Sequence, residues 1–218
     1  MTAPPNSALQ LVAYTDYKSP YAYVANRATQ ALALEYPVEL IWKPYTLRIA
    51  EYLDAVDSRS AHNWRKVKYA YMDARRLANR QGLTLKGPRR IYDGELSSLG
   101  MLFAQRAGCF DAYHEATFAR FWNHELDIDS MDQMKAHIAA LGADPTAFEA
   151  YARGAGPDEH RAIIEEAERS GVFGVPMIVF DDELFWGGDR LGMVREAIEQ
   201  RLVAQAAALR QARGGLAR

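Results

Sequence analysis

The chain has 218 residues, of which 49% are hydrophobic, and this suffices for one sizeable domain or one domain that carries a large insertion. Lys and Arg number 26 against 28 Asp and Glu, so the formal net charge of −2 gives no global electrostatic case for binding nucleic acid or an anionic membrane. No apolar run approaches the roughly 18–20 residues that span a bilayer, and residues 1–15 lack the pattern of a signal peptide.

The chain has a single cysteine, Cys109, which cannot form an internal disulfide or a CxxC redox pair. We interpret it as a small buried hydrophobic residue at a helix junction; a reactive thiol is the alternative. Cysteine usage of this kind is typical of a reducing compartment, and we expect a cytoplasmic protein.

The first half of the chain begins with a β-α-β pattern. Residues 9–14 are short and apolar and predict a buried strand, and residues 20–34 are rich in Ala and predict a helix. Residues 38–43 predict a second strand, in which Val38, Leu40 and Trp42 alternate with Glu39, Ile41 and Lys43. Because the connection is as long as a helix, we expect the two strands to be parallel.

Residues 58–154 show helical periods and no clear strand. A first amphipathic helix ends at Gly82. Gly108 separates the next two helices, and two later helices begin with capping residues and end at glycines. The apolar positions of the first helix follow a 3-4-3-4 spacing: Trp64, Val67, Tyr71, Ala74 and Ala78.

The last part of the chain predicts a helix over 156–170, two short strands and a final helix. The pair Asp181-Asp182 suits a tight hairpin between the strands. The final helix starts near Asp189, and the polar tail 207–218, with a Gly-Gly pair, is expected to fray.

Together these elements predict an α/β protein with a thioredoxin-like fold. Neither end of the chain can close a core alone, but joined they make one four-stranded mixed sheet with helices on both faces. We therefore assign residues 8–54 and 155–206 to a thioredoxin-like domain, residues 55–154 to an inserted helical domain and residues 207–218 to a C-terminal tail.

Ser19 and Pro20 stand where the first strand gives way to a helix. Serine is a good N-cap and proline is favoured at the first helical position, so the pair can be simple punctuation. The same corner has free backbone N–H groups and positive potential that suit a bound thiolate or carboxylate. The neighbouring Lys18 is expected to be an exposed loop residue.

Val175 and Pro176 precede the third strand. The proline can simply open an edge strand, where no ladder donor is lost. Alternatively the bond is cis, which is rare for X-Pro in general at about 5–6%. We predict the cis form here from the order of a helix, this proline and a strand; it would turn the Val175 backbone outward toward Ser19 as a partner for a peptide.

Three segments, "DYKSPYAYVA", "GVFGVPMIVF" and "ELFWGGDRLGMV", together resemble the 2-hydroxychromene-2-carboxylate isomerases, which belong with kappa-class glutathione transferases and more distantly with DsbA-like proteins. The segments occur in the family's order, and the resemblance spans nearly the whole chain. It implies a glutathione-dependent isomerase or transferase that acts on a small aromatic substrate, with glutathione as cofactor and a possible homodimer.

The resemblance also implies site residues. Ser19 matches the serine that faces the sulfur of glutathione, and Val175, before Pro176, matches the residue whose backbone pairs with the cysteinyl amide. Asp189 matches an acidic residue that helps to hold the γ-glutamyl end. At the position before it the family usually has a hydrogen-bonding side chain, whereas here Gly188 offers only backbone.

Other positions are open. Lys43, at the end of the second strand, could pair a substrate carboxylate or be a solvated strand-end lysine. Asn63 lies near the place of a family asparagine, but without the prolines that follow it there, so we assign it no role. The five histidines form neither HxxxH nor HExxH, and we predict no metal site.

Rival interpretations remain at this point. A non-catalytic peptide-binding or chaperone-like domain would use the exposed backbone at Val175 to hold an extended chain. A thiol-disulfide oxidoreductase is disfavoured because serine occupies the corner where redox enzymes of this fold carry cysteine.

Overall fold

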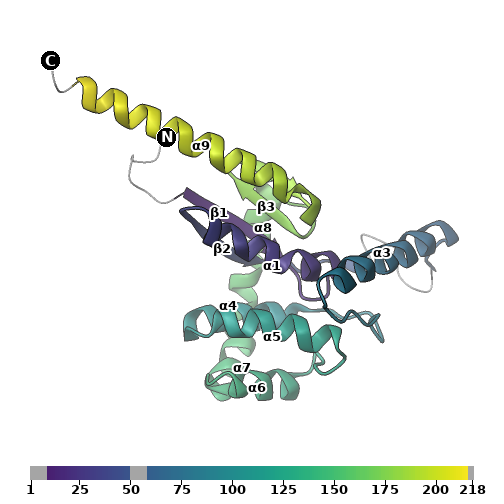
Figure 1. Ribbon diagram of the computed structural model, residues 1–218. Helices are drawn as coiled ribbons and strands as arrows, with labels where there is room; N and C mark the ends of the chain where they lie inside the picture. Colours follow the sequence, from purple (N-terminus) through teal and green to yellow (C-terminus); the bar gives the residue numbers. More distant parts are fainter. Residues whose placement is uncertain (1–8, 50–57, 216–218) are drawn as a thin grey trace.

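A computed structural model describes residues 9–49 and 58–215 and contains a four-stranded mixed sheet (Figure 1). The strands are β1 (Leu9–Thr15), β2 (Val38–Pro44), β3 (Met177–Phe180) and β4 (Glu183–Trp186), in the order β2-β1-β3-β4. β1 pairs with β2 in parallel and with β3 antiparallel, and β3 pairs antiparallel with β4. The predicted thioredoxin-like mixed sheet is therefore confirmed.

The turn between β3 and β4 is the predicted hairpin. Asp181 and Asp182 have φ values of 48° and 64°, and a two-residue turn with positive φ at both positions matches the twist of the flanking strands. Aspartate tolerates this backbone region better than most residues.

Helices cover the sheet and continue beyond it. α1 (Pro20–Glu35) contacts α3 (Ala61–Arg80), the 3₁₀ turn η2 (Gly188–Arg190) and α9 (Leu191–Gly215). α8 (Gly156–Arg169) contacts β2 and reaches the helical layer drawn farthest from α9, made of α4 (Glu95–Ala107), α5 (Phe110–Trp122), α6 (Met131–Ala140) and α7 (Pro145–Arg153) (Figure 1). Among the described residues between β2 and α8, every regular element is a helix.

Local signals position the ends of these helices as predicted. The side chains of Ser19, Ser130 and Asp144 accept hydrogen bonds from the first turns of α1, α6 and α7. Gly108 separates α4 from α5 with a φ of 72°, which an L residue with a side chain rarely adopts.

The end of α9 differs from the prediction of a frayed tail from residue 207. The helix continues to Gly215, although its side chains from Ala204 to Gln211 are largely exposed. Ala204 and residues 206–208, all alanines, have the highest helix propensity, and this outweighs the polar character that indicated a tail.

The core joins the sheet to the helical layer through aromatic side chains and one buried histidine. Tyr23 stacks on Phe118 and Trp122, and these two α5 residues are fully buried in the core. His114, also fully buried, bonds through Nδ1 to the hydroxyl of Tyr17 (2.9 Å) and through Nε2 to the side-chain oxygen of Asn26 (2.8 Å). Burial lowers the pKa of His114 to about 3.

We expect this histidine to make stability depend on pH. The unfolded chain binds a proton at His114 below about pH 6.5 while the folded chain does not, so the free energy of unfolding should fall by about 1.4 kcal/mol per pH unit between pH 6.5 and 3 for this group. We expect the free energy of unfolding of His114→Gln, measured by urea titration at several pH values, to depend less steeply on pH, by the contribution of one proton. An unchanged slope would show that His114 is protonated in the folded chain.

Candidate functional site

Ser19 lies at the buried corner between β1 and α1. Its Oγ accepts a hydrogen bond from the N–H of Ala22 at 3.2 Å, which confirms the cap, and the residue is 4% exposed. Pro20 has no N–H, so among the described residues the backbone N–H of Tyr21 is the donor of this first turn that makes no hydrogen bond. The corner therefore offers an anion this N–H and the hydroxyl hydrogen of Ser19.

Lys18 is buried rather than exposed, and the prediction for it was wrong. Its Nζ lies 2.7 Å from Asp16 Oδ2 and 2.6 Å from the carbonyl oxygen of Asp93. The same carboxylate accepts from the N–H groups of Lys18 and Leu47 at 3.1 and 2.8 Å. A lysine is buried at low cost only when it is paired in this way, and the carboxylate that pairs it lies two residues before it.

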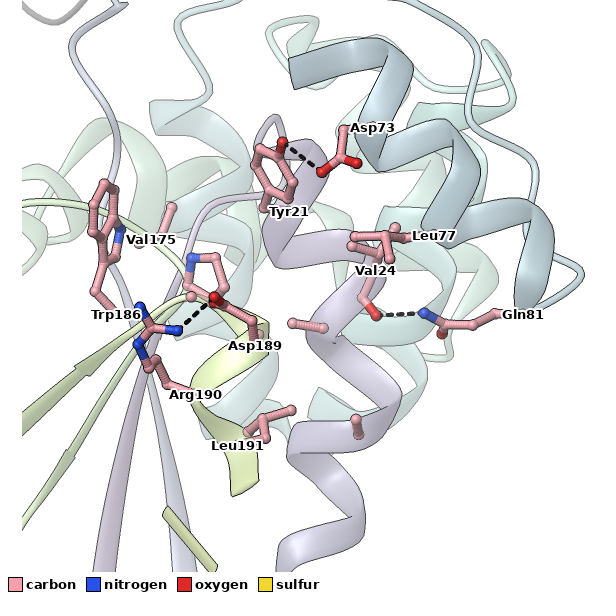
Figure 2. Close-up of a pocket in the computed structure, with 15 residues that line it drawn as sticks. Tyr21, Val24, Asp73, Leu77, Gln81, Val175, Trp186, Asp189, Arg190 and Leu191 are labelled. Atoms are coloured by element: carbon pink, nitrogen blue, oxygen red, sulfur yellow. Dashed lines mark hydrogen bonds and ion pairs between the residues drawn. The ribbon is translucent and has the colours of Figure 1, made fainter. Parts of the chain in front are cut away.

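A cavity of about 650 Å³ opens beside this corner (Figure 2). Its walls come from α1, from α3 and from the chain segments on either side of the β3-β4 hairpin. The lining residues are Tyr21, Val24, Ala25, Ala28, Asp73, Leu77, Gln81, Val175, Pro176, Trp186, Gly187, Gly188, Asp189, Arg190 and Leu191. The structure thus brings together Val175, Pro176, Gly188 and Asp189. Ser19 is not among the lining residues and precedes the wall residue Tyr21 by two positions in the chain.

The Val175-Pro176 bond is cis, as predicted. The carbonyl oxygen of Pro176 accepts from the N–H of Gly187 at 2.9 Å, which ties this segment to the end of β4. The backbone N–H and C=O of Val175 itself make no hydrogen bond with the part of the chain that the structure describes. They are available to an extended peptide in the cavity.

The glycine before Asp189 has a steric explanation. A Cβ placed on Gly188 would lie 2.9 Å from Cβ of Ala25, so this turn packs directly against α1. The missing side chain at 188 therefore follows from the close approach of two backbones. The Asp189 carboxylate, 72% exposed, pairs with the adjacent Arg190 at 2.6 Å.

α3 supplies polar residues that we did not identify from the sequence. Asp73 accepts a hydrogen bond from the hydroxyl of Tyr21 at 3.1 Å, and Gln81 donates to the carbonyl oxygen of Val24 at 2.8 Å. Burial and then the bond to Asp73 raise the pKa of Tyr21 to about 12, so the phenol stays protonated. The spacing of Asp73, Leu77 and Gln81, four residues apart, is the signal that places them on one face of a helix.

Other candidates lie elsewhere. Lys43 Nζ pairs with Glu166 Oε2 at 3.0 Å and lies outside the 650 Å³ cavity. Asn63, in the first turn of α3, is also outside its lining. Burial raises the pKa of Cys109, which is unfavourable for a reactive thiolate. Within residues 9–49 and 58–215 no group of three or more His, Cys, Asp or Glu could hold a metal ion, and no helix is long and apolar enough to cross a membrane.

Comparison with known proteins defines the class to which this arrangement belongs. The family model of the DSBA-like thioredoxin domain matches residues 10–199, and the chain belongs to this family. A structure of a probable DsbA oxidoreductase from Streptomyces coelicolor, 18% identical, has the same fold, with a TM-score of 0.72 over 88% of this chain and 89% of the other.

Within the family, the chain is similar to 2-hydroxychromene-2-carboxylate isomerases. That of Pseudomonas putida is 28% identical over 189 residues, which are 85% of this chain and 92% of the relative, and that of Sphingobium xenophagum is 28% identical over 182 residues, 82% and 92% of the two chains. A solved structure of such an isomerase, 27% identical, gives a TM-score of 0.75 over 92% of this chain and 99% of the other. The resemblance noted in the sequence is therefore confirmed.

We expect the buried pair to be the main stabilising contact of the corner. Lys18→Met should lower the free energy of unfolding by about 3–5 kcal/mol, because it leaves the Asp16 carboxylate buried without a cation. Urea titration measures the loss. The double variant Lys18→Met/Asp16→Asn, which removes both charges, should regain part of it. A single variant as stable as the parent would contradict the prediction.

Proposed function

We propose that the protein is a glutathione-dependent isomerase that acts on a small aromatic compound. The observation that carries the proposal is the unpaired peptide backbone of Val175, which lines the same cavity as the charged side chains of Asp73, Asp189 and Arg190. Glutathione combines an extended peptide backbone with a zwitterionic γ-glutamyl end. The similarity to proteins named as isomerases extends over more than four-fifths of the chain and supports an enzyme of this kind.

The residues present fit such a tripeptide. Backbone groups of Val175 can pair with its cysteinyl amide, as strand addition does elsewhere. Asp73 and Asp189 suit the α-ammonium group, and the Arg190 guanidinium suits the α-carboxylate in a charge-assisted hydrogen bond. A volume of about 650 Å³ lies in the range of about 300–1,000 Å³ that small-molecule sites usually have.

Bound glutathione would supply a thiolate able to add to a conjugated double bond and to leave after rotation about the resulting single bond. The protein's part is to stabilise the anion. The Ser19 hydroxyl and the N–H of Tyr21 can donate to it at the start of α1, where the helix dipole also favours negative charge. An unperturbed thiol titrates near 8.5, so each donor increases the fraction ionised at neutral pH.

Asp189 provides the first test. Asp189→Asn should weaken glutathione binding by roughly fivefold, because about 1 kcal/mol is typical of a hydrogen bond to a charge that stays open to solvent. Isothermal titration calorimetry with reduced glutathione measures the change. The matched control is Asp182→Asn, at the hairpin turn and outside the cavity lining.

Equal affinity in the parent and in Asp189→Asn would reject the γ-glutamyl role. If the parent itself shows no saturable binding of glutathione, the proposed function is wrong. The peptide-binding domain then becomes the better interpretation, and the same titration with extended peptides would test it.

Ser19 provides the second test. Ser19→Ala should raise the pKa of bound glutathione by about one unit and cost about 1 kcal/mol of stability as a lost cap. Ultraviolet absorbance of the thiolate in a pH titration of the complex measures the first effect. Ser130→Ala removes the equivalent cap from α6, so it should cost similar stability and leave the thiol titration unchanged. A variant at Ser19 that behaves like the one at Ser130 would show that Ser19 is only a cap.

A further inference from the structure

A second hollow, of about 830 Å³, lies between the segment that follows β2, the start of α4, and α8. It shares no lining residue with the 650 Å³ cavity. A smaller hollow of about 130 Å³ has Thr46 and Leu47 in common with it and also contains Phe173, whose ring lies 4.9 Å from the ring of Trp186 in the 650 Å³ cavity. The second hollow is therefore distinct from the proposed glutathione site.

A hydrogen-bonded pair of a hydroxyl and an imidazole, with a carboxylate close to the other ring nitrogen, lines this second hollow. Thr46 Oγ1 lies 3.0 Å from His160 Nε2, and His160 Nδ1 lies 3.6 Å from Glu95 Oε1. On its other side Thr46 Oγ1 is 2.7 Å from Ser98 Oγ. The members come from the segment after β2, from α4 and from α8, and the His160 side chain is only 5% exposed.

The negative charge of Glu95 fixes the direction of these bonds. A proton on Nδ1 of His160 faces the carboxylate, whereas a bare Nδ1 would set a lone pair against an anion. Nε2 is then the acceptor and Thr46 donates to it. Ser98 has two acceptors, the Gly94 carbonyl oxygen at 3.4 Å and Thr46 Oγ1 at 2.7 Å, and it donates to Thr46 over the shorter distance. This leaves one lone pair of the Thr46 oxygen free to accept a proton from a ligand.

The imidazole is in the state that accepts protons. Burial lowers the pKa of His160, and Lys18 lowers it further, while Glu95 and Asp16 act in the opposite direction. The folded protein therefore holds a neutral imidazole at pH 7, with a carboxylate beside it to stabilise the cation that forms on protonation.

The same array could in principle activate Thr46 as a nucleophile, but the surroundings favour proton transfer alone. Acyl transfer needs backbone N–H groups for an oxyanion. The N–H of Leu47 is bonded to the Asp16 carboxylate, and those of Asp93 and Gly94 are bonded to the Asp129 carboxylate.

The lining identifies the kind of ligand. Four carboxylates against two guanidinium groups give this hollow a net negative charge, which disfavours an anionic ligand. The charged residues are Asp93, Glu95, Glu165, Glu168, Arg48 and Arg161. The rest of the wall is mainly apolar, from residues such as Ile91, Tyr92 and Ile164.

We propose that this hollow binds an uncharged, mainly apolar compound with a phenolic or enolic hydroxyl group, whose proton the Thr46–His160–Glu95 array accepts. The ligand O–H bond breaks as its proton passes to Thr46 Oγ1, and the Thr46 hydroxyl proton moves to His160 Nε2. The products are an oxyanion on the ligand and an imidazolium beside Glu95; the reverse step returns the proton. The inference goes beyond the proposed function, since it requires neither glutathione nor an isomerisation.

Binding is tested with 2-naphthol against 2-naphthoate, which has the same ring system and a negative charge. We expect 2-naphthol to bind at least about tenfold more tightly at pH 7, because like charges disfavour the carboxylate. Ile164→Asp adds a carboxylate to this hollow and should abolish 2-naphthol binding, whereas Ala28→Asp adds one to the 650 Å³ cavity and should leave it unchanged. Equal affinity for the two probes, or the opposite response of the two variants, would overturn the site.

Proton transfer is tested by fluorescence of the bound 2-naphthol. Its excited state is a strong acid and emits at longer wavelength once a nearby base has taken the proton. Thr46→Val should retain binding and lose the naphtholate emission, whereas the exposed Thr84→Val should keep both. In the parent the emission should fade only in acid, as the imidazole, whose pKa burial lowers, takes up a proton.

A second variant tests the same proton transfer independently of whether Thr46→Val folds. Glu95→Gln changes a half-exposed side chain and removes the charge that stabilises the imidazolium, so it should weaken the naphtholate emission without loss of binding. Naphtholate emission unchanged in both Thr46→Val and Glu95→Gln would overturn the assignment of the array as proton acceptor.

Discussion

The buried ion pair between Lys18 and Asp16 is the constraint on which the arrangement of the cavities depends. One carboxylate binds the ammonium group of Lys18, two residues on, and the backbone N–H of Leu47 after β2. The ammonium group in turn binds the carbonyl oxygen of Asp93 at the start of the helical layer. A buried charge is tolerated only when its partners are all in place, so this pair fixes the β1-α1 corner, the exit of β2 and the entry to α4 relative to one another.

Sheet register completes the site around that corner. Tyr14 of β1 pairs antiparallel with Met177 of β3, so the chain that leaves β1 toward Ser19 runs beside the chain that enters β3 through Val175. Two walls of the 650 Å³ cavity thus come from segments more than 150 residues apart. A few ladder hydrogen bonds and one ion pair hold these segments in their relative positions. Helix α3 adds the third wall through the bond between Tyr21 and Asp73, which joins the helical insertion to α1.

Local chemistry explains how much the sequence predicted. Strands, helix caps and the hairpin depend on neighbours within a few residues, and Ser19, Gly108 and Asp181 behave as their residue types require. The missed features are contacts between distant segments. Thr46 and His160 are 114 residues apart, and nothing in either local pattern indicates that they meet. The burial of Lys18 uses Asp16, two residues before it, but also the carbonyl oxygen of Asp93, 75 residues later, and the local sequence does not indicate this second contact.

The single cysteine and the charged groups of the two cavities together explain why serine suits the β1-α1 corner. The chain has one cysteine, and burial raises its pKa, so the protein offers no low-pKa thiol of its own. The thiol of the proposed function must therefore come from the ligand, whose zwitterionic end would pair with the polar groups of the 650 Å³ cavity. The acidic hollow beyond Phe173 disfavours the same ligand and favours an uncharged one. The charges of the two cavities therefore select unlike molecules, and neither cavity requires the ligand of the other.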